Sequence, residues 1–576
     1  MRLPPLVLIT LVSCWASVSS RRHPDPPPLS ARAAAAINPA ERTAQYWVEE
    51  AQAGIRARVK HDKSDGVARN VVMFLGDGMS VPTLAAARTL LGQNRGRTGE
   101  ESQLSFEEFP TVGLAKTYCV NHQIADSACT ATAYLCGVKN NYGMIGLTAA
   151  VPRRDCVASL DNSTHVASIA EWALQDGRDV GIVTTTRITH ASPAGAYAKI
   201  ANRNWENDLE VLLDGQDPLL CRDIAHQLVH SYPGNQFKVN YLLHLSITSI
   251  KKKKKKKKFK RFFNYMYYLQ VILGGGRREF LPNTTFDEEG TQGLRTDGLN
   301  LIEEWQASKE SQNVDFKYVW NREQLMNLSQ SPPDYLLGLF EGDHMQYHLE
   351  ANNVTEPSLT ELTEIAIRSL SRNEKGFFLF VESGRIDHGH HDNYAHLALD
   401  ETIQLHAAVQ RATEMLSEED SLIVVTSDHS HVMAINGYSP RGNSIIGRSN
   451  EVGDDGIPYM TVSYTNGPGA RPHDNGARVD VTTEENFGSL RWRTHAEVPL
   501  EDETHGGDDV AVFARGPHHA LFTGLYEQSR IPHLMAYAAC IGPGLHYCNA
   551  ATHASYSSIF LIVTLLYMLN ALNLHR

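Results

Sequence analysis

The stretch Phe377–His391, FFLFVESGRIDHGHH, decides the fold. It starts with five apolar residues, Phe377–Val381, and a continuous apolar run of this length is typical of a strand that is buried on both faces. The run ends at Glu382, and a dense set of acidic residues and histidines follows as far as His391. A buried strand that leads into so many ionisable side chains predicts a functional edge of a β-sheet.

Four further short apolar runs repeat this pattern elsewhere in the chain. They are Val71–Leu75, Gly181–Val183, Leu422–Thr426 and Val510–Phe513. Stretches with helical character lie between the runs, at Ala125–Leu135, Val166–Gln175 and Leu397–Met415. Strands that alternate with helices indicate an α/β fold with a largely parallel central β-sheet flanked by helices.

Ionisable and hydroxyl side chains follow four of these runs. Val71–Leu75 leads to Asp77, and Gly181–Val183 leads to His190 and Ser192. Phe377–Val381 leads to Glu382 and Asp387, and Leu422–Thr426 leads to Asp428 and His429. Ligands of open parallel sheets bind beyond the carboxyl ends of the strands. We therefore expect a metal site, in which carboxylate with imidazole suits zinc and carboxylate with hydroxyl suits magnesium. A single Asp-His pair is more often a core histidine beside a surface acid, but two dense clusters at one edge argue against that reading.

The small-residue run Asp126–Ala133, DSACTATA, opens one of the predicted helices. Ser127 would lie beside the free backbone N–H groups of the helix start, which favour an anion. It is therefore a candidate nucleophile. An ordinary N-cap serine gives the same local pattern, and these residues alone leave both readings open.

The composition excludes several classes of protein. With 576 residues, 42% of them apolar and 20% charged, the chain can bury a large core, so it is not a small disulfide scaffold, a collagen-like chain, a coiled coil or a globally disordered protein. The net charge is −12, although residues 239–270 hold ten basic residues and no acid. Without that run the rest of the chain carries −22, which argues against general nucleic-acid binding.

Both ends of the chain have the composition of targeting signals. Residues 1–20 combine Arg2 with an apolar centre and small residues, which indicates a secretory signal peptide rather than a buried N-terminal strand. Residues 550–576 hold a polar spacer and the apolar run Ile559–Leu572, which indicates a glycosylphosphatidylinositol (GPI) anchor signal that follows an attachment residue at Asn549. The alternative, a membrane span, needs about 20 residues. We therefore expect a protein held at the extracellular face of the plasma membrane.

Export would permit disulfides and N-linked glycans. Cys14 leaves with the signal peptide, and seven cysteines remain, so at least one is free or pairs between chains. Cys540 and Cys548 enclose a short loop that a disulfide can close locally. The glycosylation candidates in Asn-x-Ser/Thr motifs are Asn162, Asn283, Asn327 and Asn353.

A series of motifs together resembles animal alkaline phosphatase of the membrane-bound, glycolipid-anchored type. They are Gly76–Gly78 (GDG), Asp126–Gly137 (DSACTATAYLCG), His190–Pro193, Asn202-Arg203, Glu382–His391, Ser427–His431 (SDHSH) and Glu503–Gly506. They occur in the family's order, between about Asn38 and Cys548. The resemblance implies extracellular, metal-dependent hydrolysis of phosphate monoesters to an alcohol and inorganic phosphate through a phosphoserine intermediate.

The resemblance also implies a role for each site residue. Ser127 would be the nucleophile, and Arg203 would hold two phosphate oxygens as a planar guanidinium can. Two zinc ions would clamp the attacking and leaving oxygens. The implied ligands are Asp387, His391 and His505 for the first zinc, Asp77, Asp428 and His429 for the second with Ser127 approaching it, and Asp77, Ser192 and Glu382 for magnesium. His190, His388 and His431 match positions beside these ligands.

Further implied features lie outside the catalytic edge. A calcium ion would bind Glu289, the Phe340 carbonyl, Glu341 and Glu356, and plain surface acids are the alternative. Disulfides would join Cys156 to Cys221 and Cys540 to Cys548, whereas a bridge between Cys119 and Cys129 stays open. The catalytic domain would span residues 38–548, with a loop-rich, crown-like insert at 436–502 and an N-terminal arm at Asn38–Lys60 that embraces the partner of a homodimer.

The lysine-rich segment at residues 239–270 falls outside the resemblance. The family pattern would run from Gln236-Phe237-Lys238 directly to Val271. The residues of the segment have A/T-rich codons, so we interpret it as a retained intron that is read in frame. A basic loop for anionic membranes or heparin, or a lineage-specific insertion, are the alternatives.

Two other functions fit parts of the pattern. A phosphodiesterase or sulfatase of the same metal-dependent superfamily is disfavoured because Arg203 needs an unesterified phosphoryl face. An inactive surface receptor on the same fold is disfavoured because the implied ligand set is intact.

Overall fold

The computed structural model describes residues 66–234, 269–473 and 476–545. Its centre is a ten-stranded sheet with the strand order β17-β2-β16-β8-β1-β7-β3-β4-β6-β5. In chain order these strands are β1 (Asn70–Gly76), β2 (Thr111–Lys116), β3 (Asp179–Arg187), β4 (Leu269–Gly275), β5 (Phe316–Val319), β6 (Tyr335–Leu339), β7 (Phe377–Ser383), β8 (Ser421–Ser427), β16 (Val510–Arg515) and β17 (Gly524–Glu527). Neighbours are parallel except where β16 pairs with β2 and β8, which confirms the predicted α/β class.

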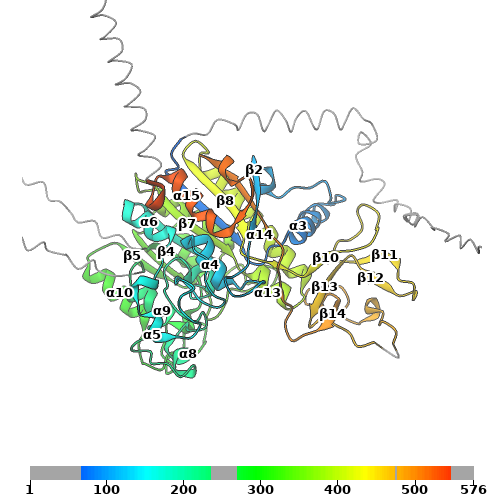
Figure 1. Cartoon of the computed structure of the whole chain (residues 1–576), viewed down its shortest axis with the longest axis horizontal. Coiled ribbons are helices and arrows are strands. Elements are labelled where there is room, and N and C mark those ends of the chain that lie inside the picture. Colours follow the sequence, from blue (N-terminus) through cyan, green and yellow to red (C-terminus); the bar gives the residue numbers. More distant parts are fainter. Residues whose placement is uncertain (1–65, 235–268, 474–475, 546–576) are drawn as a thin grey trace, which may run out of the picture.

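Helices cover both faces of this sheet, as Figure 1 shows. Val71 and Met73 of β1 face one apolar cluster, and Val72 and Phe74 face the other. The helices of the first cluster are α4 (Ser127–Cys136), α6 (Ile169–Asp176), α9 (Ile224–His230), α10 (Leu301–Ser311) and α15 (Ile531–Ala539). Those of the second are α3 (Val81–Asn94), α12 (Leu359–Leu370) and α14 (Ala395–Met415). Because both faces are covered, the central strands are buried along their length, and this explains the continuous apolar runs in the sequence.

Two of the predicted helices begin later than the sequence indicated, because a capping side chain sets each start. Helix α4 begins at Ser127, since the Asp126 carboxylate accepts hydrogen bonds from the first free backbone N–H groups. Helix α6 begins after Ser168, whose hydroxyl accepts from Glu171 N in a capping box.

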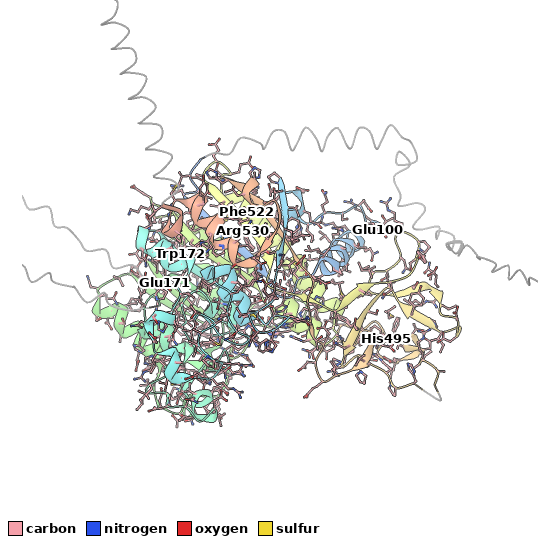
Figure 2. The ribbon with its side chains drawn as sticks, viewed as in Figure 1. Glu100, Glu171, Trp172, His495, Phe522 and Arg530 are labelled. Carbon is pink, nitrogen blue, oxygen red and sulfur yellow. A yellow bond between two sulfur atoms is a disulfide. The ribbon has the colours of Figure 1, made fainter. Side chains whose placement is uncertain are left out.

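Trp172 of α6 is buried against the ring of His533 from α15, at 5.7 Å between ring centroids (Figure 2).

A smaller lobe branches from the sheet between β8 and β16, at the right of Figure 1. It consists of a three-stranded sheet, β10 (Met433–Ile435), β13 (Val462–Gly467) and β14 (Ala496–Pro499), and a hairpin of β11 (Arg448–Val452) with β12 (Pro458–Met460). His495, labelled in Figure 2, lies in it. The chain leaves and re-enters the core through β9 (Ser430–His431) and β15 (His505–Gly506), which pair with each other. The lobe contains the predicted crown-like segment 436–502.

Five short helices lie in the connections around the sheet. They are α5 (Cys156–Ser159), α7 (Ala191–Ala194), α8 (Asp208–Leu213), α11 (Arg322–Asn327) and α13 (Arg385–His391). No helix within the three described ranges is long and apolar enough to cross a membrane. The predicted signal peptide, the arm at residues 38–60, Cys548, Asn549 and the anchor signal lie outside the described residues.

The lysine-rich segment meets the described structure at Gly234 and at Leu269. Leu269 and Gln270, which the sequence analysis placed in the insert, are the first residues of β4. Leu269 pairs with Val180, and the Gln270 amide oxygen accepts a hydrogen bond of 2.7 Å from Val180 N. The last two residues of the predicted insert therefore lie in β4. The segment enters at the amino end of β4, away from the carboxyl end where Gly275 lies.

Candidate active site

Three central strands of the sheet end level with one another. Gly76 at the end of β1 is in register with Ser383 of β7 and Ser427 of β8. The next residues of β1 and β8 are Asp77 and Asp428, so both carboxylates meet at one edge, as predicted. Within the described residues, three groups of buried or half-buried side chains at this edge bring their ligand atoms within 4.8 Å of one another. A metal ion can bind each group.

The first group consists of Asp387, His391, His431 and His505. The Nε2 atoms of His391 and His505 lie 3.1 Å apart, and each lies within 3.4 Å of an Asp387 oxygen. The Nδ1 atoms point away from this centre, toward the Glu503 carbonyl oxygen for His391 and the Ala125 carbonyl oxygen for His505. Because both Nδ1 atoms are occupied, both Nε2 atoms are oriented for a shared cation.

The second group is Asp77, Asp428 and His429, and Ser127 lies beside it. His429 Nε2 lies 3.1 Å from Asp428 Oδ2, 3.5 Å from Asp77 Oδ1 and 3.2 Å from Ser127 Oγ. Burial and the neighbouring His505 hold the pKa of His429 well below its usual value, so its ring is a neutral ligand. The first turn of α4 thus places the Ser127 hydroxyl at a candidate metal centre.

The third group is Asp77, His190 and Glu382, with Ser192 beside it. The Ser192 hydroxyl lies 3.5 Å from Asp77 Oδ2. One Glu382 oxygen accepts hydrogen bonds from Thr184 and Thr186 of β3. Its carboxylate and hydroxyl oxygens suit a hard cation, and the His190 ring is the one nitrogen donor in the group.

Several buried polar atoms at this edge have no hydrogen-bond partner, and a bound cation would satisfy them. They are Asp77 Oδ1, Asp428 Oδ2, Glu382 Oε1 and His190 Nδ1. Burial and the surrounding carboxylates raise the pKa of Asp77 well above its usual value, and burial raises that of Glu382 to about 7. Buried like charges of this kind are costly unless a cation neutralises them. The residues present therefore fit metal ions.

Arg203 lies on the same side of the site as Ser127. Its guanidinium donates to Asp126 Oδ2 at 3.1 Å and to His190 Nε2 at 3.0 Å, which leaves other N–H groups for a ligand. The Asp126 carboxylate also accepts from the Ala128, Cys129 and Gly143 backbone N–H groups. Asp126 therefore connects the start of α4 to the arginine.

The structure adds residues to this edge that the sequence analysis did not assign. Glu503 contacts both His391, through its carbonyl oxygen, and His431, through its carboxylate. His344, which follows β6, packs at 4.4 Å between ring centroids against His388, and His388 accepts from Arg385. His344 carried the same signal as the predicted site residues, a polar residue after a buried strand, but the strand itself was not recognised.

The acids predicted to bind calcium lie at a separate place. Glu341 and Glu356 are close enough to perturb each other, and burial together with Glu341 raises the pKa of Glu356 to about 8. The Glu289 carboxylate instead forms an ion pair with the buried Arg277. These three acids are not among the described groups whose ligand atoms all converge within 4.8 Å.

Four of the cysteines are paired with each other, and the glycosylation candidates lie at the surface. Disulfides join Cys156 to Cys221 and Cys119 to Cys129, which closes the alternative left open above, and Cys136 is a buried free thiol. Cys540 is disulfide-bonded. The four predicted glycosylation candidates, Asn162, Asn283, Asn327 and Asn353, are all exposed.

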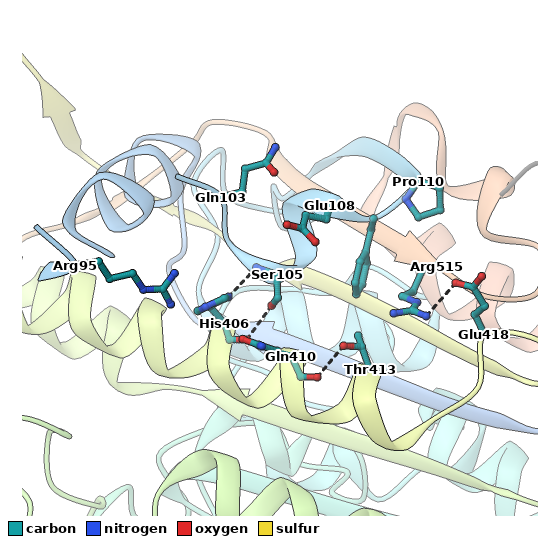
Figure 3. Close-up of a pocket in the computed structure, with 11 residues that line it drawn as sticks. Arg95, Gln103, Ser105, Glu108, Pro110, His406, Gln410, Thr413, Glu418 and Arg515 are labelled. Carbon is teal, nitrogen blue, oxygen red and sulfur yellow. Dashed lines mark hydrogen bonds and ion pairs between the residues drawn. The ribbon is translucent and has the colours of Figure 1, made fainter. Parts of the chain in front are cut away.

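A separate cavity of about 440 Å³ lies between α14 and β16 (Figure 3). His406 accepts from Ser105 N at 2.7 Å, and Arg515 pairs with Glu418 at 2.9 Å. None of the candidate metal ligands lines this cavity.

Comparison with known proteins agrees with this geometry. The alkaline phosphatase family model matches residues 68–243 and 245–541. A membrane-bound alkaline phosphatase of Bombyx mori is 62% identical over 535 residues, 92% of each chain, and the human tissue-nonspecific isozyme is 43% identical over 521 residues, 89% of this chain and 92% of the human one.

Solved structures show the same fold at low sequence identity. Alkaline phosphatase from the Antarctic bacterium TAB5 is 20% identical with a TM-score of 0.53, over 83% of this chain and 99% of that one. The Thermus thermophilus enzyme is also 20% identical, with a TM-score of 0.54, over 83% and 93% of the two chains. Together with the family match, this shows that the chain belongs to the alkaline phosphatase family, the metal-dependent phosphomonoesterases.

Proposed function

We propose that this chain hydrolyses phosphate monoesters outside the cell through a covalent phosphoserine at Ser127. The observation that carries the proposal is the position of the Ser127 hydroxyl, 3.2 Å from His429 Nε2 at the start of α4. Arg203 is held on the same side by Asp126. A candidate nucleophile, a set of candidate metal ligands and a guanidinium thus lie together, as transfer of a phosphoryl group needs.

The three groups of ligands fit two zinc ions and one magnesium ion. In this proposal Asp387, His391 and His505 hold one zinc, Asp77, Asp428, His429 and Ser127 hold the other, and Asp77, Ser192 and Glu382 hold magnesium. Mixed carboxylate and imidazole donors support zinc, and the oxygen-only set supports magnesium. When bound, the ions supply positive charge that activates oxygen nucleophiles and stabilises leaving oxygens.

The side chains of the protein then have distinct tasks. Ser127 Oγ forms a bond to phosphorus as the bond from phosphorus to the alcohol oxygen breaks, and water later replaces the serine oxygen to release inorganic phosphate. Arg203 binds two oxygens of the phosphoryl group, which orients that group for in-line attack. His190 Nε2 accepts from Arg203 and so keeps the guanidinium in place.

Three histidines support these groups without a direct ligand role in the proposal. His431 Nε2 lies 2.7 Å from Asp387 Oδ1 and its other nitrogen contacts Glu503, so it positions a zinc ligand. His388 and His190 lie at 5.6 Å between ring centroids beside the magnesium ligands.

A role in binding calcium for Glu289, Phe340, Glu341 and Glu356 is supported by the mutual proximity of Glu341 and Glu356. A cation there would have to compete with Arg277 for Glu289.

The proposed location is the extracellular face of the plasma membrane, with a GPI anchor at Asn549 after removal of residues 1–20 and 550–576. The exposed glycosylation candidates and the disulfides support export. A homodimer is proposed, in which the lobe at residues 436–502 and the arm at residues 38–60 contact the partner. The name of the Bombyx mori relative agrees with attachment to a membrane.

One experiment tests the core of the proposal. The secreted chain, freed of residues 550–576, is assayed for phosphate release from p-nitrophenyl phosphate and from the diester bis-p-nitrophenyl phosphate, before and after chelation. We expect hydrolysis of the monoester far above that of the diester, loss on chelation and best recovery with zinc plus magnesium. Preference for the diester, or full recovery with calcium alone, would contradict the proposal.

A further inference from the structure

The disulfide Cys119–Cys129 closes a short ring of chain that contains the proposed nucleophile, Ser127. Cys119 follows β2, and Cys129 lies in the first turn of α4, two residues after Ser127. The two cysteines are ten residues apart in sequence, with a Cα–Cα distance of 5.9 Å, and both are 2% exposed. The ring therefore encloses Ser127 itself.

The ring also carries the two other groups that connect the nucleophile to its surroundings. The Ala125 carbonyl oxygen lies 2.7 Å from His505 Nδ1 and so orients that ring toward the first metal group. The next residue, Asp126, accepts from Cys129 N and pairs with Arg203. Three consecutive residues thus contact the zinc ligand, the phosphate arginine and the second metal group.

The other side of the ring is held weakly. Residues 120–124 are all exposed, including apolar Val120 at 55% and Ile124 at 45%. Val120 N donates to Asn140 O and the Asn121 side chain accepts from Tyr142 N. In the described part of the chain, the backbone groups of Gln123 and Ile124 make no hydrogen bond. Exposed segments with so few contacts open at low free-energy cost.

We propose that the Cys119–Cys129 disulfide is a positioning bridge for catalysis. It fixes the exposed side of the ring to α4, so that Ala125, Asp126 and Ser127 keep their places relative to His505, Arg203 and His429. A misplacement of about 1 Å in such a site can cost 10²-fold in rate, so the bridge acts on turnover and not only on stability. This inference rests on the function proposed above.

The other disulfide of known pairing provides a contrast. Cys156–Cys221 spans 65 residues and joins α5 to the segment before α9. Neither of its cysteines is within hydrogen-bond distance of a proposed metal ligand; Cys221 Sγ lies 3.7 Å from the Ser159 hydroxyl. Cys136, a buried free thiol in the same helix as Ser127, provides a second contrast, since its Sγ faces the Gly195 carbonyl oxygen.

The test compares the double variant Cys119→Ala/Cys129→Ala with Cys136→Ala and with Cys156→Ala/Cys221→Ala, all as secreted enzyme loaded with zinc and magnesium. Turnover of p-nitrophenyl phosphate, inhibition by inorganic phosphate, zinc retention against a chelator and melting temperature are measured. We expect the first variant to lose about 10- to 100-fold in kcat, to bind phosphate more weakly and to lose zinc faster. The controls should keep kcat per zinc-loaded enzyme, whatever their melting temperatures.

A lower melting temperature with normal kcat, phosphate inhibition and zinc retention would show a purely structural bridge and overturn the inference. If the alanine pair is not secreted, Cys119→Ser/Cys129→Ser is used, because serine keeps the side-chain size and a polar atom. Ser127→Ala is measured alongside. If that variant stays active, the proposed function itself fails; if it is inactive while the ring variant is normal, only the bridge inference fails.

Discussion

The two edges of the central sheet are built from the same strands but differ in how much change in sequence and length they tolerate. At the carboxyl edge, β1, β7 and β8 end level and present Asp77, Glu382 and Asp428, each fully buried. At the amino edge, the chain between Gly234 and Leu269 gains a lysine-rich segment, and β4 still pairs with β3 and β6. The residues at the carboxyl edge must therefore keep their types and positions to form the candidate site, whereas the connections at the amino edge have only to join strands.

The largest expected effect comes from the carboxyl edge. Ser127→Ala should lower turnover by about 10³-fold or more, because the bond to phosphorus can no longer form on the protein. Zinc content should stay close to that of the parent, since Asp77, Asp428 and His429 remain. Acid quench with a labelled monoester checks this: trapped phosphoserine at normal yield in the variant would remove Ser127 from the mechanism.

A second prediction concerns how the buried Glu382 lowers the stability of the metal-free protein at high pH. Burial raises the pKa of Glu382 to about 7 from an ordinary 4.5. Between these values the folded state binds the extra proton, so stability of the metal-free protein falls as pH rises, by about 3 kcal/mol for this group. Metal-free Glu382→Gln should therefore be more stable than the metal-free parent at pH 8, and the difference should disappear at pH 4.

Thermal melting with chelator at both pH values measures this effect. Glu374→Gln, which changes an exposed glutamate just before β7, is the matched control and should show no such pH dependence. A stabilisation of Glu382→Gln that is equal at pH 4 and pH 8 would contradict the explanation by proton binding.

The third prediction separates binding from chemistry. Arg203→Ala should weaken inhibition by inorganic phosphate roughly 10- to 100-fold and raise KM, because charge-assisted hydrogen bonds to the phosphoryl oxygens are lost. Some turnover should survive. Arg153→Ala is the control, since Arg153 contacts the neighbouring Asn202 but not Asp126. Unchanged phosphate inhibition in Arg203→Ala would remove it from the phosphate site.

The smallest effect is expected at the amino edge. Deleting residues 239–270 joins Lys238 directly to Val271 of β4. We expect kcat/KM to change by less than about two-fold, because lengthening a connection costs little free energy. Secretion should rise as the basic run is removed. The secreted antigen and the phosphatase activity of the full-length and deleted forms are compared. If the full-length form is the better enzyme, or if deletion removes a heparin affinity, the segment is a functional loop.

The central part of the fold could be predicted from sequence because its strands are buried on both faces. The apolar runs that became β1, β3, β7, β8 and β16 are continuous for that reason. Strand β2 was not recognised because it alternates: Val112 and Leu114 are 48% and 39% exposed, although β2 lies between β17 and β16. Strand β5, at the edge of the sheet, is only partly buried and gave no signal either.

The candidate site could be predicted where chemistry sits directly after a buried strand, as at Asp77 and Asp428. The site could not be predicted where a side chain comes from a segment that is distant in the sequence. Glu503 contacts His391 and His431 only because β15 pairs with β9, a contact between residues some 70 positions apart. The ion pair of Glu289 with Arg277 likewise depends on side-chain packing.

The strand order has a consequence for a protease that cuts among Lys251–Lys258. The part of the described chain before the cut supplies only β1, β2 and β3, and each of these lies between two strands from the part after it. Ser127 and Arg203 would stay on one fragment, and His391, His429 and His505 on the other. The two fragments would remain interleaved through six strand pairings, so a nicked molecule should behave as an active heterodimer. The first group of metal ligands lies wholly on the fragment after the cut, whereas the second and third groups need Asp77 from one fragment and Asp428, His429 or Glu382 from the other.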